Sequence, residues 1–413
     1  MRRSRGRRRA AIVRQNDWYD QQVRREAEAL ASAGFDVEVV CVRAPGAPRR
    51  TVVNGVTIVA LPVRKRDSSA GTFIGYGVFL LRAAAYLSVQ HLRRPYALVQ
   101  ANSMPDFLVF AALVPKLLGA RVVVYMQEPT PELAETILGR KSLTPVLARL
   151  EQWSIRFAHH TVTVTEQLKQ RYVERGAPAD RITVVLNCPD PDNFLGSWSP
   201  PATRSESGFV AVCHGTIEDR YGQDTIIEAA RILHGELPDL RFVLTGSGSK
   251  AQELADSIAD HGLQDTVQFE GWVSQDRLND ILYSASVGIV AQKASPYSHL
   301  VHTNKMVDYW LFGLPVIASR LDALGEFYDD RFVEYYQPGD AADLAAAIRR
   351  LHADAGRRAE LAKNGKQAQV ENGWATQRPV YLGVFNSLLK DVDTDPPLEP
   401  AGSTPDHDPL STR

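Results

Sequence analysis

The chain has 413 residues, of which 44% are hydrophobic and 23% are charged, and its formal net charge is −1. This length predicts two domains, and the balanced charge argues against a nucleic-acid binder. The three cysteines, Cys41, Cys188 and Cys213, lie far apart, which excludes a disulfide framework and a cysteine-rich metal site and favours a reducing, cytoplasmic location.

Short apolar segments rich in β-formers alternate with amphipathic helical segments in the first half of the chain. The basic N-terminus, MRRSRGRRRA, lacks the long apolar core of a signal peptide, so we do not expect secretion. Residues 21–33 form a helical pattern that Gly34 can end. The predicted strands are residues 10–13, 37–42, 56–61, 97–100, 122–125, 161–164 and 182–186.

Two longer apolar stretches raise the question of a membrane. Residues 74–90 and 107–118 are interrupted by Arg82 and Lys116, so we do not expect a transmembrane span. Residues 79–94 can form an amphipathic basic helix. Together with the N-terminal arginines, this helix either contacts an anionic membrane surface or is an ordinary core helix with solvated arginines.

A break in the alternation divides the chain. Residues 187–207 are rich in Pro, Ser and Asp, have no periodicity, and are interpreted as an interdomain linker. A second series of strands follows, at residues 209–213, 241–244, 267–270, 287–291, 316–318 and 332–335. Alternating strands and helices predict two doubly wound, Rossmann-like α/β domains with parallel sheets.

We therefore expect an N-terminal domain over residues 1–190, a linker over 191–207 and a C-terminal domain over 208–372. Residues 391–413 are polar and rich in proline and form a predicted disordered tail. In the second domain, residues 224–234 form a predicted helix with Asp224 as its N-cap.

The most informative motif is HTNKMVDYWLFGLPVIAS, residues 302–319. Thr303 can cap a helix whose free N–H groups and dipole favour an anion, and Lys305 adds a positive charge in the first turn. Asp308 lies three residues further on and shares a face with Lys305. A bound nucleotide would use both side chains, whereas an ordinary helix would carry them as a solvated pair.

Two more motifs follow strands. In residues 209–227, Gly215 allows close approach of a ligand to the backbone, and Arg220 can bind phosphate oxygens through its guanidinium. In LTGSGSK, residues 244–250, Gly246 begins a Gly-x-Gly turn. Each segment can also be a plain turn between a strand and a helix.

The order of these motifs resembles a known family. HGTIEDRYG, LTGSGS, VQFEGWVSQDRLNDILYSASVGIV and NKMVDYWLFGLPVIAS are similar to the donor half of retaining GT-B glycosyltransferases of the bacterial glycosyl transferases group one family, family four. YDQQVRREAEALASAGFDVEVV and VVVYMQEPTPEL resemble its acceptor half. The resemblance spans residues 10–390 and implies transfer of a sugar from a nucleotide-diphosphate sugar, with retention, in glycan or polysaccharide biosynthesis.

The resemblance also implies roles for residues. Lys305 matches the lysine that contacts the donor diphosphate, Asp308 the acidic residue that binds the ribose, and Gly215 the glycine beside the phosphate. Trp272 and Val273 lie where backbone groups meet the base. The implied donor-binding residues are Gly215, Thr216, Gly246, Trp272, Val273, Thr303, Asn304 and Asp308.

The chain departs from the family pattern at three positions. Thr216 and Tyr221 stand where the family often has Arg and Lys, and Leu300 stands where it often has a glutamate that binds the sugar. Arg220, one residue before Tyr221, can supply the missing charge. These departures leave the identity of the donor sugar open.

On the acceptor side, Asp17, Gln127 and Glu128 are candidates for holding the acceptor or the sugar, so the candidate catalytic residues are Lys305, Arg220, Asp17, Gln127 and Glu128. We expect no metal and no cofactor, because the positive groups and the helix terminus could stabilise the diphosphate leaving group without a divalent ion. The acceptor can be a sugar, a lipid-linked molecule or a small molecule, and peripheral membrane contact stays open.

The resemblance further implies that the last helix, residues 373–390, crosses back to the N-terminal domain, with Val380, Val384 and Leu388 on its packing face. Two alternatives remain: a sugar-nucleotide epimerase of the same fold, and a catalytically silent protein that binds nucleotide-sugars.

Overall fold

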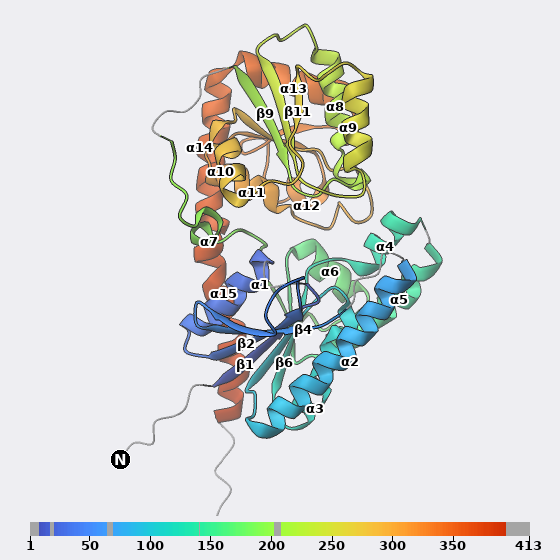
Figure 1. Cartoon of the computed structure of the whole chain (residues 1–413), viewed down its shortest axis with the longest axis vertical. Coiled ribbons are helices and arrows are strands. Elements are labelled where there is room, and N and C mark those ends of the chain that lie inside the picture. The colour runs from blue at the N-terminus through green and yellow to red at the C-terminus, as the bar shows by residue number, and fades with distance from the viewer. Residues whose placement is uncertain (1–7, 17–19, 64–68, 140, 202–207, 394–413) are drawn as a thin grey trace, which may run out of the picture.

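The computed structural model describes residues 8–16, 20–63, 69–139, 141–201 and 208–393. Two α/β domains lie one above the other, joined by a linker and by the last two helices, which run along one side of both (Figure 1). The predicted fold class, two doubly wound domains of the GT-B type, is confirmed.

The N-terminal domain is built on an eight-stranded sheet with the order β3-β4-β2-β1-β5-β6-β7-β8. All neighbours are parallel except β3 and β4, which form an antiparallel pair. The sequence prediction missed β3, because this short edge strand is half exposed. The strands are β1 (Arg9–Val13), β2 (Asp36–Val42), β3 (Arg50–Val53), β4 (Val56–Leu61), β5 (Leu98–Asn102), β6 (Arg121–Met126), β7 (His160–Thr163) and β8 (Ile182–Val184).

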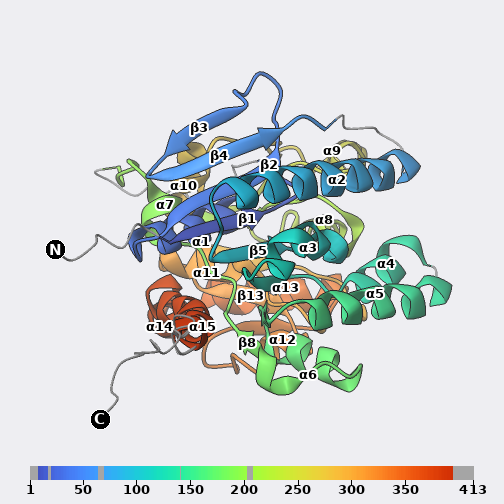
Figure 2. The same cartoon turned by 90° about the horizontal axis from the view of Figure 1, so that it is seen from below.

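The helices of this domain lie on opposite faces of the sheet (Figures 1 and 2). Right-handed crossovers explain this, because the chain moves from β1 towards β2 in one direction and from β4 towards β8 in the other. α1 therefore covers one face, and α2, α3 and α5 cover the other. The α-helices are α1 (Gln21–Ser32), α2 (Ser69–Arg93), α3 (Leu113–Leu117), α4 (Thr130–Leu138), α5 (Thr144–Phe157) and α6 (Glu166–Glu174). Short 3-10 helices span Asp106–Ala112, Lys141–Leu143 and Ala179–Arg181.

One described helix segment, Phe73–Arg93 within α2, is long and apolar enough by length and composition to cross a membrane. The expectation that no segment would do so rested on the interrupting charge of Arg82. Phe79, Ala83 and Leu87 of this helix are buried against the N-terminal domain, which is the position of a sheet-covering helix.

The C-terminal domain has a six-stranded, wholly parallel sheet with the order β11-β10-β9-β12-β13-β14. The strands are β9 (Phe209–His214), β10 (Leu240–Thr245), β11 (Val267–Phe269), β12 (Val287–Val290), β13 (Val316–Ser319) and β14 (Glu334–Tyr336). The helices are a 3-10 helix over Asp219–Tyr221, then α8 (Gln223–Leu233), α9 (Ala251–Asp260), α10 (Gln275–Ser284), α11 (Asn304–Leu311), α12 (Asp322–Gly325), α13 (Ala341–Ala353) and α14 (Ala355–Asn372).

The predicted N-cap of α8 is wrong, whereas the N-cap of α11 is at the predicted residue. Gly222, in the left-handed region, precedes α8, while Asp224 lies inside its first turn and pairs with Lys293 at 2.7 Å. Thr303 does occupy the N-cap position of α11, but its side chain makes no capping hydrogen bond.

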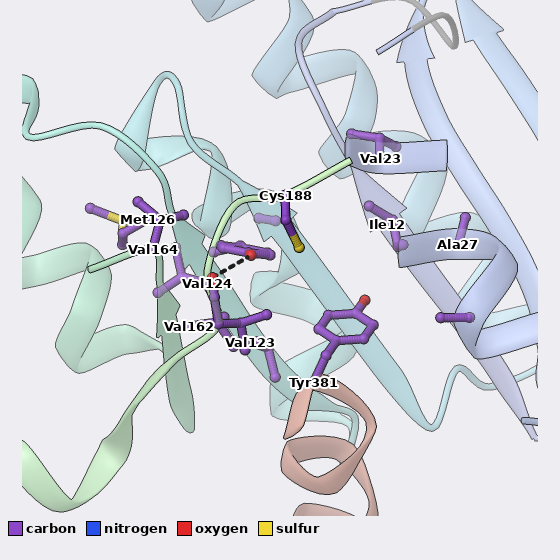
Figure 3. Packing of buried hydrophobic residues seen from close by; sticks show 14 of the residues in the cluster. Ile12, Val23, Ala27, Val123, Val124, Met126, Val162, Val164, Cys188 and Tyr381 are labelled. Atoms are coloured by element: carbon purple, nitrogen blue, oxygen red, sulfur yellow. Dashed lines mark hydrogen bonds between the residues drawn. The ribbon is translucent and has the colours of Figure 1, made fainter. Parts of the chain in front are cut away.

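The interdomain segment contains a short helix, α7 (Pro191–Leu195), and the chain ends with α15 (Trp374–Asp393). α15 contacts the N-terminal domain through a hydrogen bond from the Tyr381 hydroxyl to Gln100 Oε1 at 2.9 Å. Tyr381 points into the core between strand residues such as Val123 and helix residues such as Val23 (Figure 3).

The packing face of α15 agrees with the predicted one at buried Val384 and at half-buried Leu388, which packs against the core, but not at Val380. Tyr381, Val384, Phe385 and Leu389 are buried, whereas Val380 is exposed. One group of contacting buried apolar side chains includes residues of both domains, so apolar packing is continuous between them, and a second group lies wholly within the C-terminal domain.

Candidate active site

A cavity of about 900 Å³ lies between the two domains. Its wall on the C-terminal side comes from the carboxyl ends of β9 and β10 and the loop after β11, where ligands of parallel α/β sheets bind. Its wall on the N-terminal side comes from α1 and the β2–β4 region, including Gln21, Val42 and Asn54. Four predicted donor-binding residues, Gly215, Gly246, Trp272 and Val273, line this cavity. The Trp272 side chain is 76% exposed, so its ring is free to meet a ligand.

Two glycine turns form the floor of the cavity. Gly215 has φ of 105° and Gly246 has φ of 141°, conformations that L-residues avoid. A Cβ atom at Gly246 would lie 1.7 Å from the Gly215 carbonyl oxygen, and one at Gly215 would lie 2.7 Å from Lys305 Cε. The turns can therefore pack together beside Lys305 only because neither has a side chain. Thr216, the next residue, is exposed.

Two cations meet beside these turns. Lys305, in the first turn of α11, has Nζ 4.1 Å from the centroid of the Tyr221 ring, and Arg220 Cζ lies 4.6 Å from the same centroid. Burial lowers the pKa of Lys305, and the nearby Arg220 charge lowers it further. Tyr221, which replaces a residue that the family pattern gives as lysine, thus holds Arg220 and Lys305 close to one another.

A neutral pair lies behind the glycine turns. His214, the last residue of β9, lines the cavity, and its Nε2 is 3.5 Å from Oδ2 of Asp308 on α11. Burial lowers the pKa of His214 to about 3, with help from the Lys305 charge. Burial raises the pKa of Asp308 to about 8. Both side chains are therefore uncharged at neutral pH, and His214 Nε2 has no hydrogen-bond partner among the described residues.

A second polar group bridges the domains. Glu128 follows β6, and Tyr297, in the loop after β12, donates a hydrogen bond to it. Tyr297 also bonds to Tyr221, which bonds to Arg220. Burial raises the pKa of Glu128, while the charges of Arg14 and Arg220 oppose the shift. The Glu128 carboxyl of the N-terminal domain is thereby connected to the cations of the C-terminal domain.

Several buried polar atoms here have no hydrogen-bond partner among the residues that the structure describes. They are Arg14 Nη1, Gln127 Nε2, Glu128 Oε2, Arg220 Nε and Asn304 Oδ1. Buried polar groups are normally paired. Their concentration where the two domains meet indicates a site built to receive a polar ligand.

The structure thus gathers most of the predicted residues. Gly215, Gly246, Lys305, Arg220 and Asp308 surround the end of β9, and Glu128 faces them through Tyr297. Thr303 and Asn304 begin α11. Gln127 Nε2 has no acceptor among the described residues, whereas the Gln127 backbone N–H donates a hydrogen bond to Ser103 Oγ at 3.0 Å. Asp17 lies outside the described residues.

Sequence reasoning missed three members of the site: His214, Arg14 and Tyr297. His214 and Arg14 stand at the carboxyl ends of parallel strands, which is a usable signal for ligand contact. Tyr297 lies in a long loop and has no such signal. Leu300, at the position of the missing glutamate, is buried, and its carbonyl accepts a hydrogen bond from Thr165 Oγ1 across the domain boundary at 2.8 Å.

Among the described residues, no group of three or more His, Cys, Asp or Glu side chains could hold a metal ion.

Comparison with known proteins adds to this geometry. Residues 19–188 match the model of the glycosyl transferase 4-like domain, and residues 208–354 match that of glycosyl transferases group 1. A 2-deoxystreptamine glucosyltransferase from Streptomyces kanamyceticus is 25% identical over 80% of this chain and 88% of its own. A 2-deoxystreptamine N-acetyl-D-glucosaminyltransferase from Niallia circulans is 20% identical over 78% of this chain and 85% of its own.

Solved structures share the fold. A sucrose-phosphate synthase from Thermosynechococcus elongatus superposes with a TM-score of 0.76 at 19% identity, over 93% of this chain and 100% of that one. The Anabaena protein HepE, in complex with UDP and glucose, superposes with a TM-score of 0.68 at 15% identity, over 93% and 99%.

Proposed function

Since the chain belongs to the group 1 glycosyl transferases with the GT-B fold and is a glycosyltransferase, we propose that it moves a hexosyl group from a nucleoside diphosphate to a hydroxyl of a sugar-like acceptor. The hexosyl donor is suggested by the names of two relatives, a glucosyltransferase and an N-acetyl-D-glucosaminyltransferase. We further propose that transfer proceeds with retention of anomeric configuration and without a metal ion.

The donor occupies the interdomain cavity with its diphosphate beside Gly215. Lys305 and Arg220 bind the phosphate oxygens, since both cations lie against Tyr221 next to that glycine. The first turn of α11 adds free backbone N–H groups. Trp272 and Val273 are the contacts of the base.

The ribose hydroxyls bind the His214–Asp308 pair. At 3.5 Å the two side chains are slightly too far apart for a good hydrogen bond. A hydroxyl group that lies against both would satisfy His214 Nε2, which lacks a partner among the described residues. Asp308 therefore acts together with His214, because the bound hydroxyl group lies against both side chains.

Glu128, Gln127 and Arg14 bind the sugar and the acceptor from the N-terminal side. Asp17 is a further candidate, by its place in the sequence. The bond between the anomeric carbon and the leaving phosphate oxygen breaks, and the acceptor oxygen bonds to the same face of that carbon. The acceptor proton passes to the leaving phosphate oxygen. Lys305 and Arg220 stabilise the negative charge that develops there, which is the role a metal ion has in other enzymes.

The observation that carries this proposal is the meeting of Lys305 and Arg220 at the Tyr221 ring, with Lys305 beside Gly215, which lines the cavity. The test is a panel of nucleoside-diphosphate hexoses with aminocyclitol and sugar acceptors, with and without a chelator. We expect glycosylated product, an unchanged rate with chelator, and an axial anomer from an axial donor by NMR. Loss of activity with chelator would exclude the metal-free reaction, and an inverted product would exclude retention.

The same panel separates two other activities. An epimerase would change the free sugar nucleotide without an acceptor, and a silent binding protein would show ligand-dependent thermal stabilisation without product. Either result would contradict the proposed transfer.

A further inference from the structure

The outer side of α2 is apolar along its length. Ile74, Leu81, Val89 and Leu92 are all exposed, and Leu81 and Leu92 are 71% and 70% exposed. Their spacings of 7, 8 and 3 residues keep them on one side of the helix. The opposite side, which includes Phe79, is buried against the domain. α2 is therefore apolar on both sides, although the described residues cover only one of them.

The apolar surface continues onto the neighbouring helices. Leu117 and Leu118 at the end of α3 are exposed, and the Leu118 backbone bonds to His91 near the end of α2. On α5, Val146 and Trp153 are exposed. These helices lie on the same side of the N-terminal domain (Figures 1 and 2). We call the exposed side of α2, α3 and α5 the outer helix face.

The charges around this face have one sign. Residues 69–126 contain five Lys and Arg but only one acidic residue, Asp106, which is buried. Exposed Arg82 and Arg93 on α2 and Arg149 on α5 make no ion pair with any residue in the described ranges. The acid of α5, Glu151, is buried and pairs with Arg175 at 3.0 Å. A local positive charge thus stands out on a chain whose net charge is −1.

We propose that the outer helix face docks on the surface of an anionic lipid bilayer. Exposed leucines and a tryptophan bordered by unpaired arginines match the interfacial region of such a bilayer, where apolar side chains insert and arginines meet lipid phosphates. α2 lies in the plane of the interface and does not span the bilayer, because Phe79, Ala83 and Leu87 hold its other side in the domain core.

The position of the face bears on the acceptor. α4 begins two residues after Glu128, and Ile137 near its end is exposed. The loop that carries Glu128 is therefore connected to the helices that would lie on the bilayer. Docking would bring the acceptor side of the enzyme to membrane-bound acceptors, but the docking itself does not rest on the proposed reaction.

The experiment measures sedimentation of the full chain with vesicles of phosphatidylcholine alone and with vesicles containing equal parts of phosphatidylglycerol. We expect binding to the anionic vesicles that weakens with added salt. The double variant Leu81→Ser, Leu92→Ser should bind roughly tenfold more weakly, since two exposed apolar side chains no longer insert. The matched control Val370→Ser, Val380→Ser changes exposed valines on α14 and α15 and should bind as the natural chain does.

A charge variant makes the test independent of the leucines. Arg82→Gln, Arg93→Gln should remove most of the preference for phosphatidylglycerol. Absence of vesicle binding by the natural chain would overturn the proposal. Equal binding by the leucine double variant and the valine control would also overturn it. A concentration-dependent dimer that dissociates in the leucine variant, with no vesicle binding, would show that a second copy covers this face and would also overturn it.

Discussion

The two domains have the same architecture but present different chemistry at the ends of their strands. The C-terminal domain presents cations and bare backbone: Lys305, Arg220 and the turns of Gly215 and Gly246. The N-terminal domain presents Glu128 and Gln127. Parallel strands bring their carboxyl ends to one edge in both domains. The fold therefore determines where a ligand can bind, and the residues of the loops determine which chemical groups the ligand meets. In the proposed reaction, the diphosphate accordingly binds on the C-terminal side of the cavity and the hydroxyl-bearing acceptor on the N-terminal side.

Their outer helices differ as well. The described part of the C-terminal domain exposes only Trp272 and Val370 among its large hydrophobic side chains, and its surface carries ion pairs such as Arg349–Glu236 at 2.6 Å. The N-terminal domain exposes leucines along α2 and α3. Topology alone thus does not decide what a helix layer contacts. The outer helices of the C-terminal domain have a polar surface suited to water, whereas those of the N-terminal domain have an apolar surface suited to an apolar partner.

The most severe test of the donor side is Lys305→Ala. Removing a cation that stabilises the leaving diphosphate should lower turnover roughly 100-fold or more and weaken binding of a nucleoside diphosphate by about 1.5–3 kcal/mol. Calorimetric titration and initial rates measure the two effects. Lys363→Ala, an exposed lysine on α14, is the control. Unchanged donor affinity would remove Lys305 from the site.

The opposite domain should respond differently. Glu128→Gln keeps the size of the side chain and its contact with Tyr297 but removes the carboxylate, so turnover should fall roughly tenfold. Donor affinity should stay within about twofold, because the diphosphate contacts lie in the other domain. Rates and titrations on the same variant test this contrast. An equal loss of donor affinity would mean that the two sides are not separable.

The buried carboxyl of Asp308 should make the stability of the protein depend on pH. Its pKa is about 8 in the folded protein and near 4 when unfolded, so the folded state keeps a proton that the unfolded state loses in between. The free energy of unfolding therefore falls as pH rises through that window, by up to about 1.4 kcal/mol per pH unit. The free energy of unfolding of Asp308→Asn, measured by urea unfolding, should rise relative to that of the natural chain as the pH is raised from 5 to 8.

Asp276→Asn, on the exposed side of α10, serves as the control for that profile. A stability difference that stays constant with pH would show that Asp308 is ionised in the folded protein.

The smallest expected effect concerns the crossing helix. Tyr381→Phe removes the hydrogen bond to Gln100 and leaves its buried oxygen without that donor, which should cost about 1 kcal/mol of stability. Urea unfolding followed by tryptophan fluorescence measures it, and donor affinity should not change. A fall in donor affinity would indicate that α15 also sets the relative position of the domains.

Much of the fold was predictable because it depends on local patterns. Apolar runs of strand length alternate with helical periodicity, and this alternation identified both parallel sheets. β3 escaped prediction, because a short, half-exposed edge strand has no apolar run. Val380 was wrongly placed on the packing face of α15, because the spacing of apolar residues does not show which of the neighbours Val380 and Tyr381 is buried.

The site follows the same division. Glycines at strand ends and a lysine in the first turn of a helix are visible in the sequence, because strand–turn–helix order already determines their surroundings. The sequence by itself therefore determined the fold class and the glycosyltransferase function, and it predicted that Gly215, Lys305 and Asp308 belong to one site. Only the tertiary structure decided that Tyr221 holds two cations together, that His214 faces Asp308 and that Tyr297 connects Glu128 to the other domain. These contacts join residues far apart in the chain, and no local periodicity encodes such a meeting.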